Sequence, residues 1–140
     1  GNISKRFSLS GIEIPRYGGA CPRWNIYSAF TTPGKIHAAV SKMSNGEKYV
    51  CIARTVEKGV GRYGKSKSML SIGLGCEVKY AKDFVYTENL NVNDKKTEIP
   101  IGVSCRTCDR LDCSQRAFPP LHKKFDVDIN SRGVSVYVSD

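Results

Sequence analysis

The residues with the clearest chemical potential are three cysteines close together in the sequence, Cys105, Cys108 and Cys113. The first two form a C-x-x-C pair, which brings two thiolates within reach of one metal ion, and the third follows closely enough to complete a face of a tetrahedral site. Cys76 is the candidate fourth ligand, because the glycines just before it allow a tight turn. Four thiolates suit zinc or an iron–sulfur cluster, and the spacing does not separate the two.

Two other interpretations of these cysteines stay open. A thioredoxin-like exchange site needs the C-x-x-C pair at the start of a long helix, whereas Asp109 and Arg110 follow it here. Reduced cysteines also pack as small apolar side chains, and this is the interpretation we give to Cys21 and Cys51.

A glycine-rich segment, residues 59–66, matches the G-x-x-x-x-G-K-[ST] pattern of phosphate-binding loops. Such a loop must open a helix whose N-terminal amides hold the phosphates, but residues 68–75 have the pattern of a strand. We therefore do not expect nucleotide hydrolysis. The segment is either a plain hairpin loop or a basic loop that holds the phosphates of a bound ligand through Lys58, Arg62, Lys65 and Lys67.

No pattern of residues indicates an enzyme. His37 lies in a strand pattern and His122 in a loop, and neither has a serine or a carboxylate at a spacing that argues for a catalytic triad.

A hairpin is the clearest local structure. Ile36, Ala38 and Val40 alternate as in a half-buried strand, Asn45 and Gly46 form a typical reversing turn, and residues 49–56 return as the partner strand. Residues 69–74 predict another strand, and residues 7–14 predict at most a short one. Helices are predicted from Pro22 onward, where Trp24, Tyr27 and Phe30 recur, over residues 77–86, and after Asp112 as far as the prolines at 119 and 120. The tail, residues 125–138, holds two alternating stretches.

These elements predict an α+β fold with a mostly antiparallel sheet flanked by two or three short helices, similar to small-ligand sensor domains. The length of 140 residues fits one domain, which we place at residues 3–140, with residues 1–2 as a cloning remnant. No run of about 18 apolar residues occurs, so no membrane segment is expected, and without a leader we expect a cytoplasmic protein. The net charge of +9 favours an anionic partner.

Several blocks of the chain resemble the C-terminal domain of short-chain fatty acyl transcriptional regulators. The cysteine-containing run at residues 101–110 and its continuation at 113–120 look like the signature of that family, and residues 18–25, 53–56 and 72–77 resemble further blocks. The likeness extends from about Ser4 to Pro120, and the residues after His122 match poorly.

The resemblance implies the effector-sensing domain of a larger bacterial transcription regulator. Such regulators have an N-terminal helix-turn-helix, so DNA would be bound only through domains absent from this chain, in which no helix-turn-helix pattern occurs. The implied effector is an acyl-coenzyme A, and the implied cofactor is an iron–sulfur cluster on Cys76, Cys105, Cys108 and Cys113, with zinc as the alternative. The whole regulator is a candidate homodimer.

Coenzyme A is a polyanion with an apolar acyl end, so the candidate ligand residues are basic and aromatic. Each has an ordinary alternative, since most arginines are solvated or paired internally and most large aromatics belong to the core. Two other functions remain open, a zinc-stabilised nucleic-acid-binding module and an iron–sulfur redox-sensing domain. The candidate ligand residues are Arg23, Trp24, Arg54, Lys65, Arg106, Arg116 and Phe118.

Overall fold

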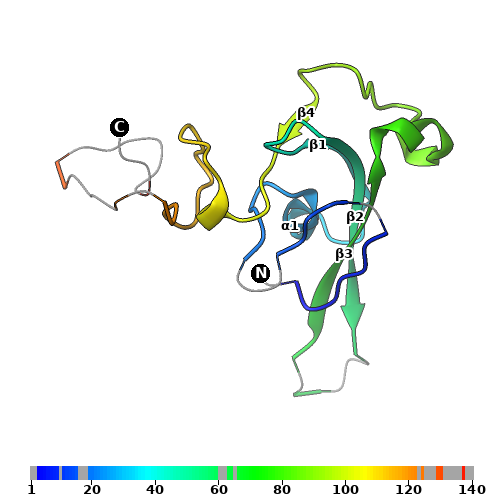
Figure 1. Cartoon of the computed structure of the whole chain (residues 1–140). Coiled ribbons are helices and arrows are strands. Elements are labelled where there is room, and N and C mark those ends of the chain that lie inside the picture. Colours follow the sequence, from blue (N-terminus) through cyan, green and yellow to red (C-terminus); the bar gives the residue numbers. More distant parts are fainter. Residues whose placement is uncertain are drawn as a thin grey trace. The chain divides into compact units, whose positions relative to one another are not determined.

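The structure is a computed structural model that describes residues 3–9, 11–15, 19–59, 63–64, 66–122, 124, 129–130 and 137. The chain divides into two compact units (Figure 1). The first comprises residues 1–23 and 101–140, and the second comprises residues 24–100. The second unit is therefore inserted between the two segments of the first. Among the described residues, no helix is long and apolar enough to cross a membrane.

The second unit is built on a four-stranded sheet with the order β3-β2-β1-β4. Strands β1, β2 and β3 pair antiparallel, and β4 pairs parallel with β1. The predicted α+β fold with a mostly antiparallel sheet is confirmed. The inner strands supply the core, in which Val40, Tyr49 and Val50 are almost fully buried. The strand bounds are β1 His37–Lys42, β2 Lys48–Lys58, β3 Ser68–Glu77 and β4 Glu98–Pro100.

The predicted hairpin is confirmed as β1 and β2. Gly46 has a φ of 90°, a left-handed conformation that glycine adopts without strain, and its N–H donates to the carbonyl of Met43 at 3.0 Å. The N–H of Met43 donates in turn to the carbonyl of Glu47 at 2.8 Å. The register then pairs Lys42 with Lys48 and Val40 with Val50.

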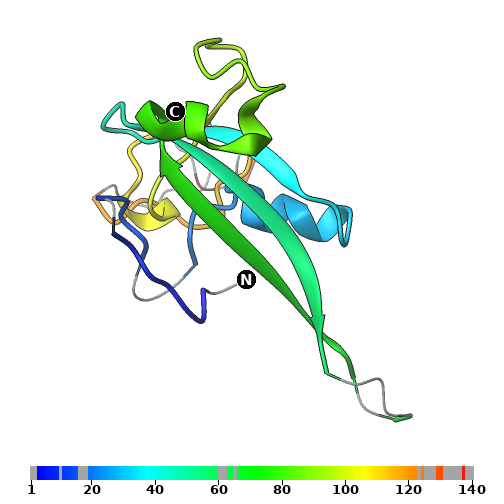
Figure 2. The ribbon, with the colours of Figure 1, turned by 90° about the vertical axis from the view of Figure 1, so that its right-hand side faces the viewer.

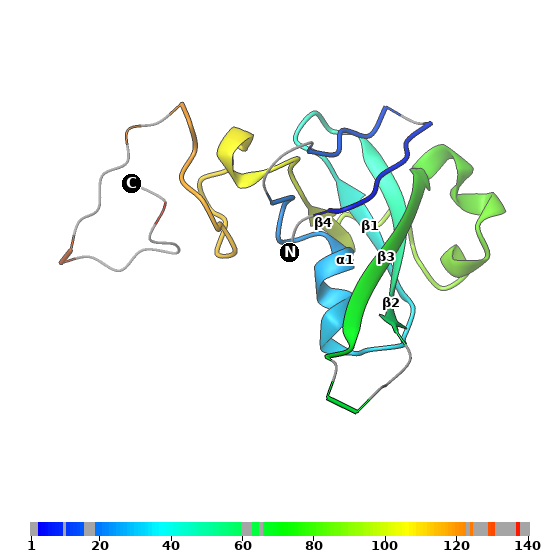
Figure 3. The ribbon, with the colours of Figure 1, turned by 90° about the horizontal axis from the view of Figure 1, so that it is seen from below.

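One face of the sheet is covered by helix α1 (Asn25–Ser28), which continues as the 3₁₀ helix η1 (Ala29–Thr31) (Figure 3). The amide of Asn25 donates to the carbonyls of Cys51 at 2.9 Å and His37 at 3.2 Å, so the helix is tied to two strands. The helix approaches β3 so closely that a Cβ at Gly73 would lie 2.5 Å from a methyl group of Ile26.

The helices differ in detail from the sequence prediction. The first begins at Asn25 instead of Pro22. Residues 77–86 do not form one helix but two 3₁₀ helices, η2 (Val78–Asp83) and η3 (Val85–Thr87), with extended backbone at Phe84 between them. The hydroxyl of Thr87 donates to the carbonyl of Phe84 at 2.6 Å and thereby competes with a continuous helix.

The glycine-rich segment after β2 leads directly into β3. Gly59 and Gly64 have φ values of 107° and 79°, as expected of a hairpin loop, and no helix follows. The element that follows the segment is thus a strand, whereas a nucleotide-binding phosphate loop opens a helix. Residues 60–62 and 65 of this loop lie outside the described part of the chain. Most of the tail at 125–138, where two alternating stretches were expected, lies outside it too. The short strand predicted within residues 7–14 is not formed by the described residues 7–9 and 11–14.

Candidate functional site

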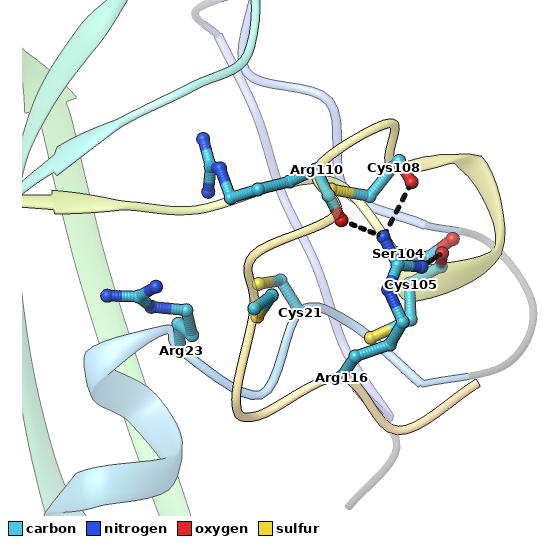
Figure 4. A pocket seen from close by; sticks show the side chains of 8 residues that line it. Cys21, Arg23, Ser104, Cys105, Cys108, Arg110 and Arg116 are labelled. Carbon is cyan, nitrogen blue, oxygen red and sulfur yellow. Dashed lines mark hydrogen bonds between the residues drawn. The ribbon is translucent and has the colours of Figure 1, made fainter. Parts of the chain in front are cut away.

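The first unit contains a small cavity lined by sulfur atoms (Figure 4). Its volume is about 10 Å³, close to the space that one water molecule needs. Two distant stretches of sequence form it, and they are joined where the N–H of Cys21 donates to the carbonyl of Val103 at 3.1 Å. The lining residues are Cys21, Arg23, Ser104, Cys105, Cys108, Arg110, Cys113 and Arg116.

Local backbone structure holds the cysteines in place. Cys105 opens the 3₁₀ helix η4 (Cys105–Thr107), and the N–H of Cys108 donates back to the carbonyl of Cys105 at 3.4 Å. A Cβ at Gly102 would lie 3.3 Å from the sulfur of Cys108, so the chain passes very close to this thiol. The helix predicted after Asp112 is absent, because residues 108–122 form turns and irregular backbone.

Arg116 is the central organising residue of this site, and its side chain is 5% exposed. One terminal nitrogen donates to the carbonyls of Cys105 at 2.7 Å and Phe118 at 3.3 Å. The other donates to the carbonyls of Cys108 at 2.9 Å and Arg110 (Figure 4). A guanidinium is suited to this role because it presents several donors in a fixed plane.

The positive charge of Arg116 is buried beside the four thiols. No carboxylate of the described residues pairs with it, and its Nε–H is buried without a hydrogen-bond partner in the same set. Since its terminal nitrogens are occupied by carbonyl groups, Arg116 supports the loop and is poorly placed to hold a phosphate. Its unpaired charge favours electron-rich groups nearby, such as thiolate sulfur.

The thiols of the site are reduced and mostly buried. Burial raises the pKa of the Cys21 thiol, and hydrogen bonds from the backbone of Gly102 and Arg23 act in the opposite direction. The sulfur of Cys105 accepts a hydrogen bond from the N–H of Ala117 at 3.3 Å. The net effect on Cys21 is a raised pKa, which favours its protonated form.

The donor set fits a thiophilic metal in its chemistry, although the present geometry is not that of a bound ion. Four sulfur atoms and a buried unpaired N–H surround one cavity, and N–H groups directed at sulfur are common around metal–thiolate centres. In the described part of the chain, no three histidine, cysteine, aspartate or glutamate side chains stand close enough to hold a metal ion as they are. Loading would require the thiols to close in on the cavity for zinc, or the loop to open for a larger cluster.

Cys76, the predicted fourth ligand, belongs to the other unit. It lies on β3 opposite Val50, and its place among the cavity-lining thiols is taken by Cys21. Burial, followed by the charges of Asp83 and Glu77, raises the pKa of Cys76. On the neighbouring strand, burial raises the pKa of Cys51 to about 11.

Two of the predicted ligand residues come together in the first unit. The guanidinium carbon of Arg106 lies 4.8 Å from the centre of the Phe118 ring, a cation–π contact, and both side chains are exposed. Arg23, which is half-buried, lines the cysteine cavity in the same unit.

The remaining predicted ligand residues do not belong to the described part of the first unit. Trp24 is buried at the start of α1 with its indole N–H unpaired among the described residues, and Arg54 is exposed on β2 in the second unit. Lys65 lies outside the described residues.

Comparison with known proteins identifies the class of the chain. Residues 1–137 match the family described as short-chain fatty acyl coenzyme A regulator, C-terminal. The chain is 44% identical over 140 residues to the HTH-type transcriptional regulator RamB of Mycobacterium tuberculosis, covering 99% of this chain and 30% of that protein. It is 42% identical over 137 residues to the propionyl-CoA carboxylase regulator of Cereibacter sphaeroides, covering 98% of this chain and 29% of that protein.

A solved structure of a transcriptional regulator shares the fold of this chain. A Mycobacterium tuberculosis transcriptional regulator superposes with a TM-score of 0.85 at 37% identity, covering 97% of this chain and 41% of that one. These relatives are bacterial transcription regulators. The chain belongs to the family of short-chain fatty acyl coenzyme A regulators and corresponds to their C-terminal domain, which spans less than a third of the length of the curated relatives.

Sequence reasoning missed one residue of the site and gave another a different role. Cys21 was interpreted as a structural thiol, because no spacing rule connects it with cysteines that follow a whole inserted unit. Its place in a block that resembles the family, residues 18–25, was the available signal. Arg116 was placed among phosphate ligands, and nothing in the sequence indicates that its donors turn inward to carbonyl groups.

Proposed function

We propose that the chain is the effector-sensing domain of a transcription regulator of short-chain fatty acid metabolism, and that its effector is an acyl-coenzyme A. Family membership over almost the whole chain supports the regulatory role. The net charge of +9 supports an anionic effector. DNA is bound by other parts of the longer protein, and the domain itself is not an enzyme.

The observation that carries the effector proposal is the exposed stack of Arg106 on Phe118. The contact with the ring restrains the guanidinium, and because both side chains are exposed, its N–H groups are available for bidentate contact with a phosphate oxygen. A flat cation over an aromatic ring also offers a stacking surface to adenine. Coenzyme A carries both a purine and several phosphates, so it can use both features at once.

Calorimetry with coenzyme A and its acetyl, propionyl and butyryl thioesters tests this proposal. We expect Arg106→Ala to weaken binding about tenfold, the usual effect of losing a hydrogen bond to a charged group. Lys79→Ala is a matched control, because Lys79 also lies over an exposed ring, that of Tyr80 at 4.9 Å, in the second unit. Absence of binding by the unmodified chain at millimolar thioester would refute the effector proposal.

A second proposal concerns the cysteine cavity. We infer that it holds zinc or an iron–sulfur cluster through Cys21, Cys105, Cys108 and Cys113. Zinc would supply a fixed tetrahedral crosslink, and a cluster would supply a redox-responsive one. The buried charge of Arg116 would offset part of the negative charge of the thiolates in either case.

Anaerobic reconstitution followed by iron, sulfide and zinc analysis tests the metal proposal. We expect Cys21→Ser and Cys108→Ser to lose metal, whereas Cys76→Ser, the control, retains it. Loss in the Cys76 variant with retention in the Cys21 variant would instead restore the ligand set expected from sequence. Sequence-selective binding of promoter DNA by this chain alone would favour the nucleic-acid-binding alternative over both proposals.

A further inference from the structure

Strand β3 lies at the edge of the sheet and pairs only with β2 among the described strands. Its ten residues stay in unbroken antiparallel register, without a bulge or a proline. An edge of this kind presents a row of N–H and C=O groups that can pair with another strand. Natural edge strands are usually blunted by inward charges, prolines or bulges, and β3 has none of these between Ser68 and Cys76.

The sheet face on the side away from α1 is apolar and open along this edge. Since α1 contacts β3 at Gly73 and side chains alternate along a strand, Leu70, Ile72 and Leu74 point to the opposite face. They are 40%, 52% and 62% exposed, respectively. Figure 2 shows the β2–β3 ribbon extending well beyond the other described elements of the second unit.

We propose that β3 pairs with β3 of a second copy of this chain, antiparallel and centred on Ile72. A two-fold axis through this residue places Ile72 opposite its own counterpart and Leu70 opposite Leu74 of the other copy. All three apolar side chains then meet on one face of a continuous sheet that runs through both copies.

Charge supports a second copy as the partner. The chain carries +9, so two copies repel one another over most of their surface, but residues 68–76 contain no charged side chain. In the register centred on Ile72, Lys67 of each copy stands opposite Glu77 of the other. The neutral strand is thus bounded at both ends by a pair of opposite charges, whereas centring the axis on residue 73 would place Lys67 opposite Lys79.

The interface is small, because it joins two strands and the apolar rows beside them. Interfaces of this size lie at the low end of the range for specific complexes. We therefore expect a dissociation constant of about micromolar or weaker. Such a dimer forms at the concentrations reached in the laboratory, and in a longer protein it would be strengthened by any further contact between copies.

Sedimentation velocity on the full 140-residue chain, from low micromolar to near-millimolar concentration, tests the proposal. Ile72→Lys places two like charges directly opposite each other at the axis, and we expect it to weaken the dimer by about tenfold or more. Val85→Lys is the matched control, since Val85 is 74% exposed on η3 and lies off the edge. Circular dichroism of both variants checks that they are folded.

A charge exchange tests the register. We expect Lys67→Glu and Glu77→Lys to weaken the dimer about fivefold each, because each places like charges in contact at both ends. The double variant restores opposite charges across the axis and should recover the dimer. In the double variant, the ion pairs within one chain, Lys67 with Glu57 and Glu77 with Lys79, stay broken. Recovery of the dimer can therefore come only from contacts between copies.

Three results would overturn the proposal. A chain that stays monomeric at every concentration would leave this edge to another segment of the longer protein. A dimer unaffected by Ile72→Lys would lie on a different surface. Failure of the double variant to recover would refute the register. Hydrogen exchange supplies an independent measurement, because pairing should slow exchange of the backbone amides at residues 68–76 as the concentration rises.

Discussion

Replacement of Arg116 by methionine should open the cysteine site without unfolding the second unit. Methionine fills part of the same volume but removes every donor. The bond to the buried carbonyl of Cys105 contributes about 1.5–3 kcal/mol, as is usual for a hydrogen bond to a charged group. The three other bonds are partly exposed to water, and their carbonyls can be rehydrated, so each contributes about 0.5–1 kcal/mol.

These contributions give a loss of about 3–6 kcal/mol for the loop around the site. The described residues of the first unit offer little apolar core to absorb such a loss, because those that are buried are mostly small, Ala20 and the cysteines beside Ile101. We therefore expect local opening of the loop. Since about 1.4 kcal/mol corresponds to a factor of ten, the open form should be populated at least about a hundredfold more than in the unmodified chain.

Thiol alkylation measures this opening directly. Cys105 and Cys113 are 7% and 8% exposed, so iodoacetamide reaches them through the open form, and mass spectrometry follows each site. Arg106→Met is the control, because an exposed cation–π contact contributes at most about 1 kcal/mol and its loss should change the rates less than about tenfold. Alkylation of both cysteines in the Arg116 variant at the rate of the unmodified chain would show that the guanidinium does not hold the loop.

Three further predictions concern the second unit. Gly73→Val should lower its thermal midpoint by the equivalent of about 1–3 kcal/mol, since the new side chain meets Ile26, and calorimetry measures this. Burial raises the pKa of Tyr49 to about 12, so stability present below pH 10 should be lost as the pH rises towards 12. An absorbance titration should show a late-ionising tyrosine that is missing in the Tyr49→Phe variant. Lys48 lowers the pKa of the Glu98 carboxyl, so this pair stabilises the fold above the ordinary glutamate pKa and ceases to do so as the pH falls through the lowered value. Urea denaturation of Glu98→Gln should show a smaller loss of stability in acid.

The strands of the second unit were predictable because their signals are local. Asn45 and Gly46 define the turn between β1 and β2, and alternation of apolar side chains on either side fixes the pairing. The edge position of β3 was not predictable, because its apolar residues look the same in sequence whether or not a neighbour covers them. The helix expected over residues 77–86 became two 3₁₀ helices, since the Thr87 side chain takes carbonyl groups that a continuous helix would use.

The site was predictable only in part, for a related reason. The C-x-x-C spacing brings Cys105 and Cys108 together locally, and Cys113 follows on the same loop. The remaining thiol is brought in by the tertiary fold, which sequence spacing does not encode, so Cys76 was an expectation based on neighbouring glycines. The structure places Cys21 at the cavity through its hydrogen bond to Val103, a contact that has no local signature.

The insertion of residues 24–100 between the two halves of the first unit also has a mechanical consequence. The chain enters and leaves the inserted unit next to the backbone bond from Cys21 to Val103, which closes the base of a long loop. Tension applied at the two ends of the chain is therefore carried by this closure and reaches the inserted sheet only after the closure has broken. A crosslink between Cys21 and the loop at 105–113 would carry this tension past the inserted unit. Only after the crosslink had broken could the inserted unit be extended.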